Sequence, residues 1–385
     1  MKSCNYSRRE FLRASGAGAA AGMGGALGAA EAPASKVALA KCADYGASLG
    51  PALKTMFDQL GGLGRLVKGK TVAVKINMTG SPQQRLGTTP AEFAQYTHPA
   101  VTGHVVRMLG EAGAVRVRIL EGAFSTGEPL DEFMIDAGWD PAPLLTAAPK
   151  VEFENTNMKG RWGRYAKFPV PGGGSIFPEY YLNQAYEQCD VLISLAKLKE
   201  HATCGVTMAI KNMFGALPLT IYGDHASKTD VDEEMTKGGR GTILHYGRRQ
   251  PAAISPKEKD PASPREGQYR VPRIIADLAA ARPIHLSIVD GIYTMAGGEG
   301  PWNGRVWAIR PGVLLAGLNP VCTDAVCTAV MGFDPMAAKG TAPFERCDST
   351  LELAERNGVG TRDLNRIEIV GAPLETVRFE IRKRA

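Results

Sequence analysis

The sequence predicts an α/β fold, in which helices flank a mainly parallel sheet, and two observations lead to this prediction. Apolar runs of strand length alternate along the chain with stretches of helical periodicity, which is the pattern of βαβ units. Apolar residues make up 44% of the 385 residues and charged residues 22%, close to ordinary globular usage, which excludes disordered, collagen-like and coiled-coil chains. The pattern leaves open whether the fold is one body or two lobes with a site between them.

The first βαβ unit is predicted from residue 71 to residue 121. The run TVAVKIN at residues 71–77 predicts a buried strand, and VRVRILE at residues 115–121 predicts the next one. Between them, residues 99–112 have the spacing of a helix, with Thr97 expected as its cap and Pro99 in its first turn.

The remaining elements follow from the same patterns. Residues 223–268 are rich in charged residues, Pro and Gly and lack apolar periodicity, so an insertion, a lid or a partly mobile surface excursion is expected there. The core of the domain is expected at about residues 72–334. Further central strands are expected at residues 189–195, 284–289 and 313–318, helices at 49–60, 206–214, 271–281 and 320–331, and edge strands at 367–370 and 377–381.

The N-terminal residues resemble a twin-arginine translocation signal. The motif SRREFLR at residues 7–13 precedes a weakly apolar, Ala/Gly-rich stretch, and Ala32-Pro33-Ala34 offers a cleavage site. The resemblance implies a signal peptide at residues 1–34 and a domain at 35–385 that the twin-arginine translocase exports, already folded, to the periplasm or another extracytoplasmic compartment. No stable membrane span is expected after cleavage. The Ala/Gly-rich stretch is itself too rich in glycine to be favoured as a membrane anchor. The alternatives are an Ala/Gly-rich helix with a basic cap and an uncleaved anchor.

Charge and cysteine content exclude two further classes of function. The formal charge of +6 is a mild excess that falls to +4 once residues 1–34 are removed, because they carry four basic and two acidic residues, so no nucleic-acid partner is expected. The seven cysteines form no C-x-x-C motif, so the chain has no ferredoxin-type iron–sulfur cluster box. Buried thiols are the favoured interpretation for most of these cysteines, and one or two disulfides remain open.

Polar residues gather just after the predicted strands, at the edge where open α/β sheets bind ligands. Three of them, Lys199, His201 and Lys211, are the candidate catalytic residues. A desolvated lysine can act as a base or nucleophile, and a histidine as a general acid, a base or a metal ligand. The candidate ligand- or cofactor-binding residues are Lys75, Asn77, His98, Lys197, Asn212, Asp290, Glu299 and Asp324.

Each of these candidates also has a structural interpretation. The lysines could form a solvated basic face, His201 could be a helix-terminal histidine bonded to backbone, and Asp290 could be a turn aspartate before Gly291. A charge-rich loop supplies a possible metal cluster, although such loops are more often solvated. That cluster would comprise Asp224, His225, Asp230, Asp232 and Glu233.

Six segments in order resemble the family of the domain of unknown function 362. They are KINMTG from residue 75, THPAV from 97, LAKLKEH from 195, IKNMFGALP from 210, DGIYTMAGGEGPWNG from 290 and NPVCTDAV from 319. Ile76 stands where the family has Pro, and the ferredoxin appended to some members has no counterpart, which weakens a role in electron transfer. The family name states that its chemistry is unsettled, so the resemblance identifies a site and no reaction.

A weaker similarity connects the same residues to the lactate racemase family. The spacing from His201 through Gly205 and Lys211 to Gly215 is similar to that family's H-x3-G-x5-K-x3-G stretch, and the residues around His98 resemble its T-H-R-P. The resemblance implies that Lys211 attaches a nickel-pincer cofactor and that His201 and His98 handle metal and protons. The racemase's D-x-T-R segment has no match here, so the presence of a metal or organometallic cofactor stays open.

Together, these patterns predict an exported protein with one ligand pocket. The leading hypothesis is an enzyme that acts on a small anionic substrate through a Lys/His pocket, with a cofactor loaded before export as an option. The alternative is a non-catalytic binding or carrier protein for a metal, an iron–sulfur cluster or a cofactor. No G-x-S-x-G, Walker or H-E-x-x-H motif occurs, which argues against ordinary hydrolases, P-loop enzymes and zincins.

Overall fold

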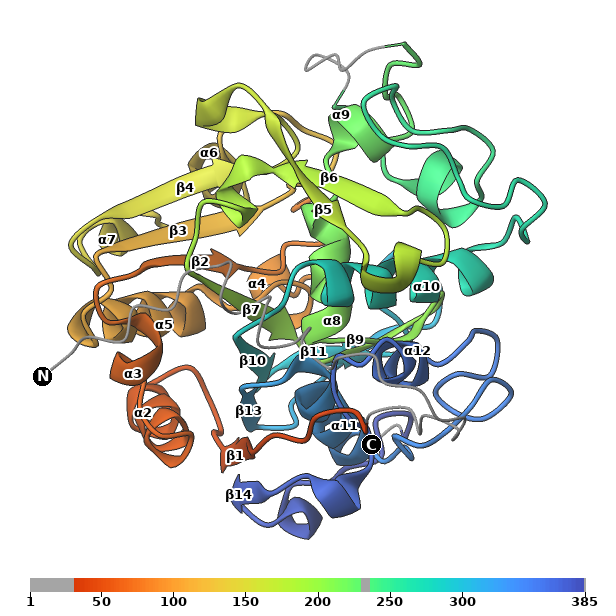
Figure 1. Ribbon diagram of the computed structural model, residues 1–385. Coiled ribbons are helices and arrows are strands. Elements are labelled where there is room, and N and C mark those ends of the chain that lie inside the picture. Colours follow the sequence, from red (N-terminus) through yellow and green to blue (C-terminus); the bar gives the residue numbers. More distant parts are fainter. Residues whose placement is uncertain (1–30, 230–235, 384–385) are drawn as a thin grey trace, which may run out of the picture. The chain divides into compact units, whose positions relative to one another are not determined.

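The computed structural model describes residues 31–229 and 236–383, and these residues surround a central sheet (Figure 1). Within them, eight strands pair in the order β14-β1-β13-β10-β7-β2-β3-β4, and all except β13 run in the same direction. The strands are β1 (Val37–Lys41), β2 (Thr71–Lys75), β3 (Arg116–Glu121), β4 (Val151–Asn155), β7 (Val191–Lys197), β10 (Leu286–Gly291), β13 (Val313–Gly317) and β14 (Ile369–Gly371).

Helices cover both faces of this sheet, so the central strands have no solvated face. Every residue of β7 is buried. Side chains that alternate along the strands divide the core in two: Val72 and Val74 pack with α2 (Leu49–Gln59) and α5 (Pro99–Glu111). On the opposite face, the core includes residues of α8 (Ala209–Asn212), α10 (Gly267–Ala281), α11 (Pro320–Val330) and α12 (Thr350–Arg356).

Shorter elements connect these layers. Three two-stranded ribbons are formed by β5 (Tyr165–Pro169) with β6 (Glu179–Asn183), β8 (Lys199–His201) with β9 (Gly205–Thr207), and β11 (Thr294–Ala296) with β12 (Trp307–Ile309). The short helices are α3 (Gly64–Val67), α4 (Ala91–Ala94), α6 (Leu130–Asp136), α7 (Ala142–Leu145), α9 (Leu219–Tyr222) and a π-helical turn, η5 (Gly241–His245).

The strand order reverses between β2 and β7. From β2 the chain moves outward to β3 and β4, and it then returns to place β7 on the other side of β2, with β10 beyond it. The carboxyl ends of β2 and β7, at Lys75 and Lys197, flank this switch point. Ligands of open α/β sheets bind in the crevice outside such a point.

The predicted fold class is confirmed, and most predicted strands and helices are present within one or two residues. The predicted helix 206–214 is an exception, because Gly205–Thr207 forms strand β9 and only Ala209–Asn212 is α-helical. Gly205 has a φ of +78°, which allows the tight turn that pairs β9 with β8.

Two further predictions were wrong. Residues 377–381 contain no strand. The outermost strand at that edge of the sheet is β14, and it pairs with β1, which the sequence patterns did not reveal. The cap of α5 is His98, whose Nδ1 accepts from the Ala100 N–H, whereas the Thr97 hydroxyl donates to the Leu195 carbonyl.

From Ala32 onward the chain forms one compact unit, so two lobes are not seen. The described part of residues 223–268 packs against this unit, with Ile243 and Leu244 fully buried. Among the described residues no helix is long and apolar enough to cross a membrane. The cysteines from Cys42 to Cys347 are unpaired. The predicted signal peptide lies almost entirely in residues 1–30, outside the described residues.

Candidate functional site

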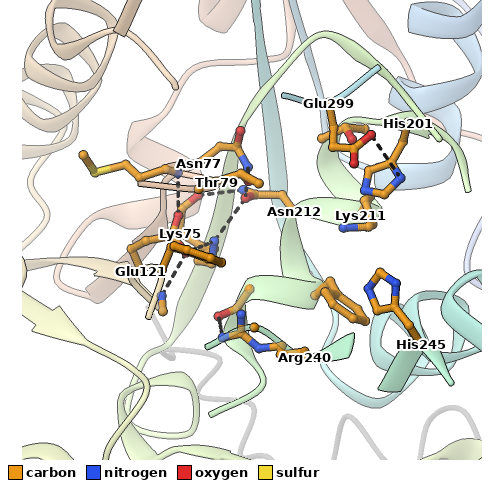
Figure 2. Close-up of a pocket in the computed structure, with 18 of the residues that line it drawn as sticks. Lys75, Asn77, Thr79, Glu121, His201, Lys211, Asn212, Arg240, His245 and Glu299 are labelled. Atoms are coloured by element: carbon orange, nitrogen blue, oxygen red, sulfur yellow. Dashed lines mark hydrogen bonds and ion pairs between the residues drawn. The ribbon is translucent and has the colours of Figure 1, made fainter. Parts of the chain in front are cut away.

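A cavity of about 260 Å³ lies at the carboxyl edge of the sheet, beside the switch point (Figure 2). In Figure 2, residues from the ends of β2 and β3 lie on one side of it, residues from the β8–α8 region on the other, and residues near η5 below. The polar residues that line the cavity are Lys75, Asn77, Thr79, Glu121, His201, Thr207, Lys211, Asn212, Arg240, His245 and Glu299.

A buried ion pair forms the wall at the end of β2. Lys75 Nζ lies 2.7 Å from Glu121 Oε1, and it also donates to the Ile76 carbonyl at 2.7 Å and to Asn212 Oδ1 at 3.1 Å. Glu121 Oε2 accepts from the Met78 N–H at 2.8 Å. Burial lowers the pKa of Lys75, and Glu121 partly opposes that shift. The Lys75 ammonium and the Glu121 carboxylate therefore balance each other's charge.

Two asparagines present an acceptor to the cavity. Asn212 Nδ2 donates to the Lys75 carbonyl at 3.0 Å and to Ser194 Oγ at 3.1 Å, so Asn212 Oδ1 is the acceptor that faces Asn77. Asn77 Nδ2 donates to this oxygen at 3.3 Å and to Thr79 Oγ1 at 3.1 Å. This orientation leaves the buried Asn77 Oδ1 without a donor among the described residues.

Lys211 lies on α8, which a buried carboxylate holds in place. Asp324 accepts from the Ala209 and Ile210 N–H groups, both at 2.9 Å, and so caps the helix. Burial raises the pKa of Asp324 to about 7 and lowers the pKa of Lys211. Within the described residues, Lys211 Nζ has no hydrogen-bond or ion-pair partner, and it lies 4.5 Å from the centroid of the Phe214 ring.

Arg240 is a half-buried arginine whose guanidinium contacts carbonyl groups and no carboxylate in the described part of the chain. Its Nε donates to the Leu217 carbonyl at 2.7 Å, and its Nη2 donates to Asn157 Oδ1 at 3.0 Å and to the Gly215 carbonyl at 3.2 Å. These three bonds use one edge of the fork and leave Nη1 without an acceptor there. Burial lowers the pKa of Arg240 to about 10, so the group stays charged at neutral pH.

Two imidazoles line the cavity in their neutral form. His201 Nδ1 accepts from the Thr203 N–H at 3.1 Å, which assigns its proton to Nε2. Burial lowers the pKa of His201 to about 3 and that of His245 to about 4. Glu299 Oε2 lies 3.8 Å from His201 Nδ1. Burial opposes ionisation of Glu299, but N–H donors from the Ala202 backbone and the Trp302 indole hold its pKa below its ordinary value.

Glycines allow this close packing at two positions. A Cβ on Gly215 would lie 2.9 Å from Glu121 Oε1 and 3.0 Å from Lys75 Nζ, so a side chain there would disturb the ion pair. A Cβ on Gly80, whose φ is +83°, would lie 2.3 Å from the Trp302 ring. Trp302 itself is 43% exposed and lines the cavity.

A second group of side chains lies at the same edge of the sheet but outside the cavity lining. Lys197 Nζ lies 2.9 Å from Asp290 Oδ2, and both side chains are fully buried. The Tyr45 hydroxyl accepts from Lys197 at 3.0 Å and donates to Asp290 at 3.1 Å. The His98 ring stacks on Tyr45, and the His98 N–H donates to Asp290 at 3.1 Å. We call Tyr45, His98, Lys197 and Asp290 the closed cluster.

Only some of the predicted site residues therefore line the cavity. Lys199 is fully buried and donates to the Gln95 carbonyl at 2.8 Å and the Glu299 carbonyl at 3.1 Å, outside the cavity lining. Burial lowers its pKa to about 7. Asp324 lies beneath α8, and His98, Lys197 and Asp290 belong to the closed cluster. The predicted residues that do line the cavity are Lys75, Asn77, His201, Lys211, Asn212 and Glu299.

Three ionisable residues of the cavity were missed from the sequence. Glu121 ends β3, and the rule that polar residues at strand ends face ligands could have found it. Arg240 and His245 lie in the segment that lacks periodicity, where no local signal marks them.

The candidate metal cluster receives no support from the described residues, which contain no group of three or more His, Cys, Asp or Glu that could hold a metal ion. Asp224 instead accepts from the Gly239 N–H at 3.0 Å and the Thr242 N–H at 2.5 Å. Asp230, Asp232 and Glu233 lie outside the described residues.

Comparisons with known proteins identify similar chains. The family described as "Domain of unknown function (DUF362)" matches residues 72–329. A thylakoid-associated protein of Synechocystis sp. is 28% identical over 321 residues, which are 83% of this chain and 81% of that protein.

Two solved structures have weak likenesses to this fold, both at 14% identity. The lactate racemase apoprotein from Thermoanaerobacterium thermosaccharolyticum has a TM-score of 0.35, with 71% of this chain and 54% of that chain covered. A crystal structure of a protein from Thermotoga maritima has a TM-score of 0.34, with 64% of this chain and 50% of that chain covered. The chain thus spans about half the length of these two structures, and the likenesses carry no inference about activity.

Proposed function

This chain belongs to the family of the domain of unknown function DUF362, and from that premise we propose that it is an enzyme acting on a small anionic substrate in the cavity around Lys211. In this proposal Lys211 is the reactive amine and Arg240 holds the anion. His201 and His245 transfer protons.

The observation that carries the proposal is a difference among four buried or half-buried lysines. Lys75, Lys197 and Lys199 each donate to oxygen acceptors at 2.7–3.1 Å. Lys211 has no acceptor among the described residues, although it lines the same cavity as Lys75. An unpaired amine in a desolvated site has a larger neutral fraction, which is the form that acts as a base or nucleophile.

The charges of the cavity support an anionic ligand. The Lys75 charge is balanced by Glu121, and Glu299 receives N–H donors from Ala202 and Trp302. No carboxylate contacts Arg240 or Lys211 in the described residues. A buried charge without a partner is costly, so a bound anion would lower the electrostatic energy of the site.

The neutral imidazoles support proton transfer. His201 presents an Nε2–H, and the low pKa of His245 keeps its ring able to accept a proton at pH 7. A neutral histidine is the commonest general acid or base in enzymes. Lys211 and the two imidazoles therefore supply donors and acceptors within one enclosure.

A cofactor carrier is the second candidate, and the observation that favours it is that Lys211 and His201 line the same cavity. An amine can attach a cofactor covalently, and an imidazole can ligate a metal that the cofactor holds. In that case Lys211 would be the attachment residue and Arg240 would hold an anionic part of the group. The intact mass of the chain, purified from the cytoplasm of its native organism, distinguishes the carrier from the enzyme. A carrier with a covalently attached cofactor has a mass above that of the polypeptide.

The proposed location is an extracytoplasmic compartment, reached by the twin-arginine translocase. The supporting observations are the SRREFLR motif and the name of the Synechocystis relative, which places that protein with thylakoids. Replacing Arg8 and Arg9 together with Lys should keep the chain in the cytoplasmic fraction, whereas the control Arg13→Lys should leave export unchanged. Unchanged export of the double variant would show that another route is used.

The function is tested by screening small organic anions for a rise in the melting temperature and for turnover. The expected result is a set of carboxylates that stabilise the wild-type chain and the control Lys54→Met, but not Lys211→Met. Lys54 is an exposed lysine that pairs with Asp58 and does not line the cavity. If Lys211→Met and His201→Ala variants fold and keep all anion binding and turnover, the proposal is wrong.

A further inference from the structure

We propose that the substrate is a small 2-oxo carboxylate, whose carboxylate binds Arg240 and whose carbonyl carbon forms a Schiff base with Lys211. The inference rests on the proposed function and deepens it, since it names the substrate class and the covalent step. Three groups on the cavity wall carry it, namely a guanidinium edge, an amine and an amide oxygen.

The guanidinium edge is Nη1 of Arg240. Its other N–H groups are fixed by the Leu217 and Gly215 carbonyls and by Asn157 Oδ1, so the fork is held rigidly. The two N–H groups of Nη1 have no acceptor in the described residues, and Arg240 lines the cavity. The two N–H groups of one nitrogen diverge, so Nη1 offers a carboxylate oxygen one charge-assisted hydrogen bond, and its geometry is prepared before the anion arrives.

The amine is Lys211 Nζ, whose position is set by α8 and its Asp324 cap. The Phe214 ring lies against the amine and no oxygen of the described residues accepts from it. Schiff-base lysines are amines of this kind, desolvated and close to another cation. In contrast, Lys75 and Lys199 donate to oxygen acceptors that stabilise the ammonium form, which has no nitrogen lone pair to attack a carbonyl carbon.

The amide oxygen is Asn77 Oδ1, a buried acceptor without a donor. Its orientation is fixed because Asn77 Nδ2 must face Asn212 Oδ1. An anion or a ketone cannot donate to this oxygen, but the hydroxyl that forms when an amine adds to a ketone can do so. Asn77 therefore fits the addition product better than the substrate, which favours the covalent step.

The step is balanced without an oxidant or reductant. The nitrogen lone pair of neutral Lys211 forms a bond to the carbonyl carbon, and the carbonyl π electrons move to oxygen. The two protons lost by nitrogen are carried to that oxygen by His201 and His245, the C–O bond breaks, and water leaves. The products are an imine and one water molecule. The cavity volume of about 260 Å³ restricts the substrate to a small acid.

The experiment is borohydride trapping on the full chain with pyruvate as the probe. The expected adduct has the mass of one pyruvate less one oxygen atom, and peptide mapping should place it on Lys211. Acetone, which has the carbonyl without the carboxylate, should give about tenfold less adduct, the effect expected from losing one charge-assisted interaction. Arg240→Gln should lower the yield with pyruvate by a similar factor.

Matched controls separate folding from chemistry. Arg248 is an exposed arginine of the same segment that does not line the cavity, so Arg248→Gln should trap pyruvate as the wild type does. Lys211→Arg and Lys211→Met should give no adduct at residue 211. Their far-ultraviolet circular dichroism should match the wild type.

The outcomes distinguish this inference from the proposed function. If pyruvate and propionate both raise the melting temperature in a Lys211-dependent way but no adduct forms at Lys211, the Schiff base is overturned and the anion site stands. Labelling confined to exposed lysines such as Lys54 overturns the Schiff base as well. If no small carboxylate stabilises the chain and no adduct forms, both proposals are overturned.

Discussion

The cavity and the closed cluster lie at the same edge of the sheet and contain the same kinds of side chain, yet their charges are arranged in opposite ways. In the closed cluster, Lys197 is bound to Asp290 at 2.9 Å and to the Tyr45 hydroxyl at 3.0 Å. In the cavity, Lys211 has no such partner among the described residues, and neither does the Nη1 edge of Arg240.

The two lysines therefore differ in pairing and not in residue type, and this difference separates Lys197 from Lys211, the lysine that we propose to be reactive. Burial lowers the pKa of both Lys197 and Lys211. The closed cluster opposes that shift with a carboxylate, whereas the cavity leaves an amine available for a ligand. Five substitutions test this comparison, and the first four are ordered from the largest expected effect to the smallest.

Asp290→Asn should have the largest effect on stability. It leaves the buried Lys197 ammonium without its carboxylate, and breaking a buried pair in this way costs about 3–5 kcal/mol of the free energy of unfolding. Urea denaturation measures the loss. The control Asp58→Asn breaks an exposed pair with Lys54 and should cost less than about 1 kcal/mol. Equal losses in the two variants would contradict the closed cluster as a structural pair.

Gly215→Ala should destabilise the cavity wall by about 1–3 kcal/mol, the range for an inserted methyl group. The new methyl would lie 2.9 Å from Glu121 Oε1 and 3.0 Å from Lys75 Nζ, so the ion pair must move. Differential scanning calorimetry and pyruvate trapping should both report the change. Gly304→Ala is the control, because no atom lies within 4 Å of its added Cβ. A Gly215→Ala variant with wild-type stability would show that the wall tolerates displacement.

Lys211→Met should raise the free energy of unfolding by about 1 kcal/mol at pH 7 while it abolishes trapping, because reactive sites keep unpaired groups at the expense of stability. The lowered pKa of Lys211 gives the sign with pH. At pH values between the lowered pKa of Lys211 in the folded chain and 10.5, the unfolded chain binds one more proton than the folded chain. The free energy of unfolding of the wild type therefore rises with pH, and the stability difference between Lys211→Met and the wild type shrinks. Lys199→Met should instead destabilise, since two carbonyls lose their donor. A destabilised Lys211→Met would indicate a structural lysine.

His245→Gln should have the smallest effect, confined to acid pH. Because burial holds the pKa of His245 at about 4, the unfolded chain binds a proton between pH 6.5 and pH 4 that the folded chain does not. The free energy of unfolding of the wild type therefore falls as pH drops through this window, and the variant should lose about 0.5–1 kcal/mol less between pH 7 and pH 6. Urea denaturation at the two pH values measures the difference.

His98 makes the matching test in the closed cluster, because burial lowers its pKa to about 4 as well. His98→Gln should show the same flatter pH dependence together with a constant loss of stability, since His98 Nδ1 caps α5. If the two histidine variants had identical profiles, the two regions would not differ in the way their imidazoles are used.

The sequence by itself determined strands β2, β3, β7, β10, β13 and β14, most of the main helices and the edge of the sheet that carries the site, whereas β1 and β4 were missed. These features depend on local patterns, since a buried strand such as β7 needs a continuous apolar run and α5 needs its periodic spacing and a Pro in the first turn. The order of the motifs also identified the family and predicted Lys75, His201, Lys211 and Asn212 as site residues.

Only the tertiary structure decided which of those residues share the cavity. Lys197, Lys199 and Lys211 lie within 15 positions of one another, and no local pattern distinguishes them. Their partners come from distant segments, Asp290 for Lys197 and the Gln95 and Glu299 carbonyls for Lys199, while Arg240 joins Lys211 from a segment without periodicity. Electrostatic pairing depends on the distance through space, which the sequence encodes only through the complete fold.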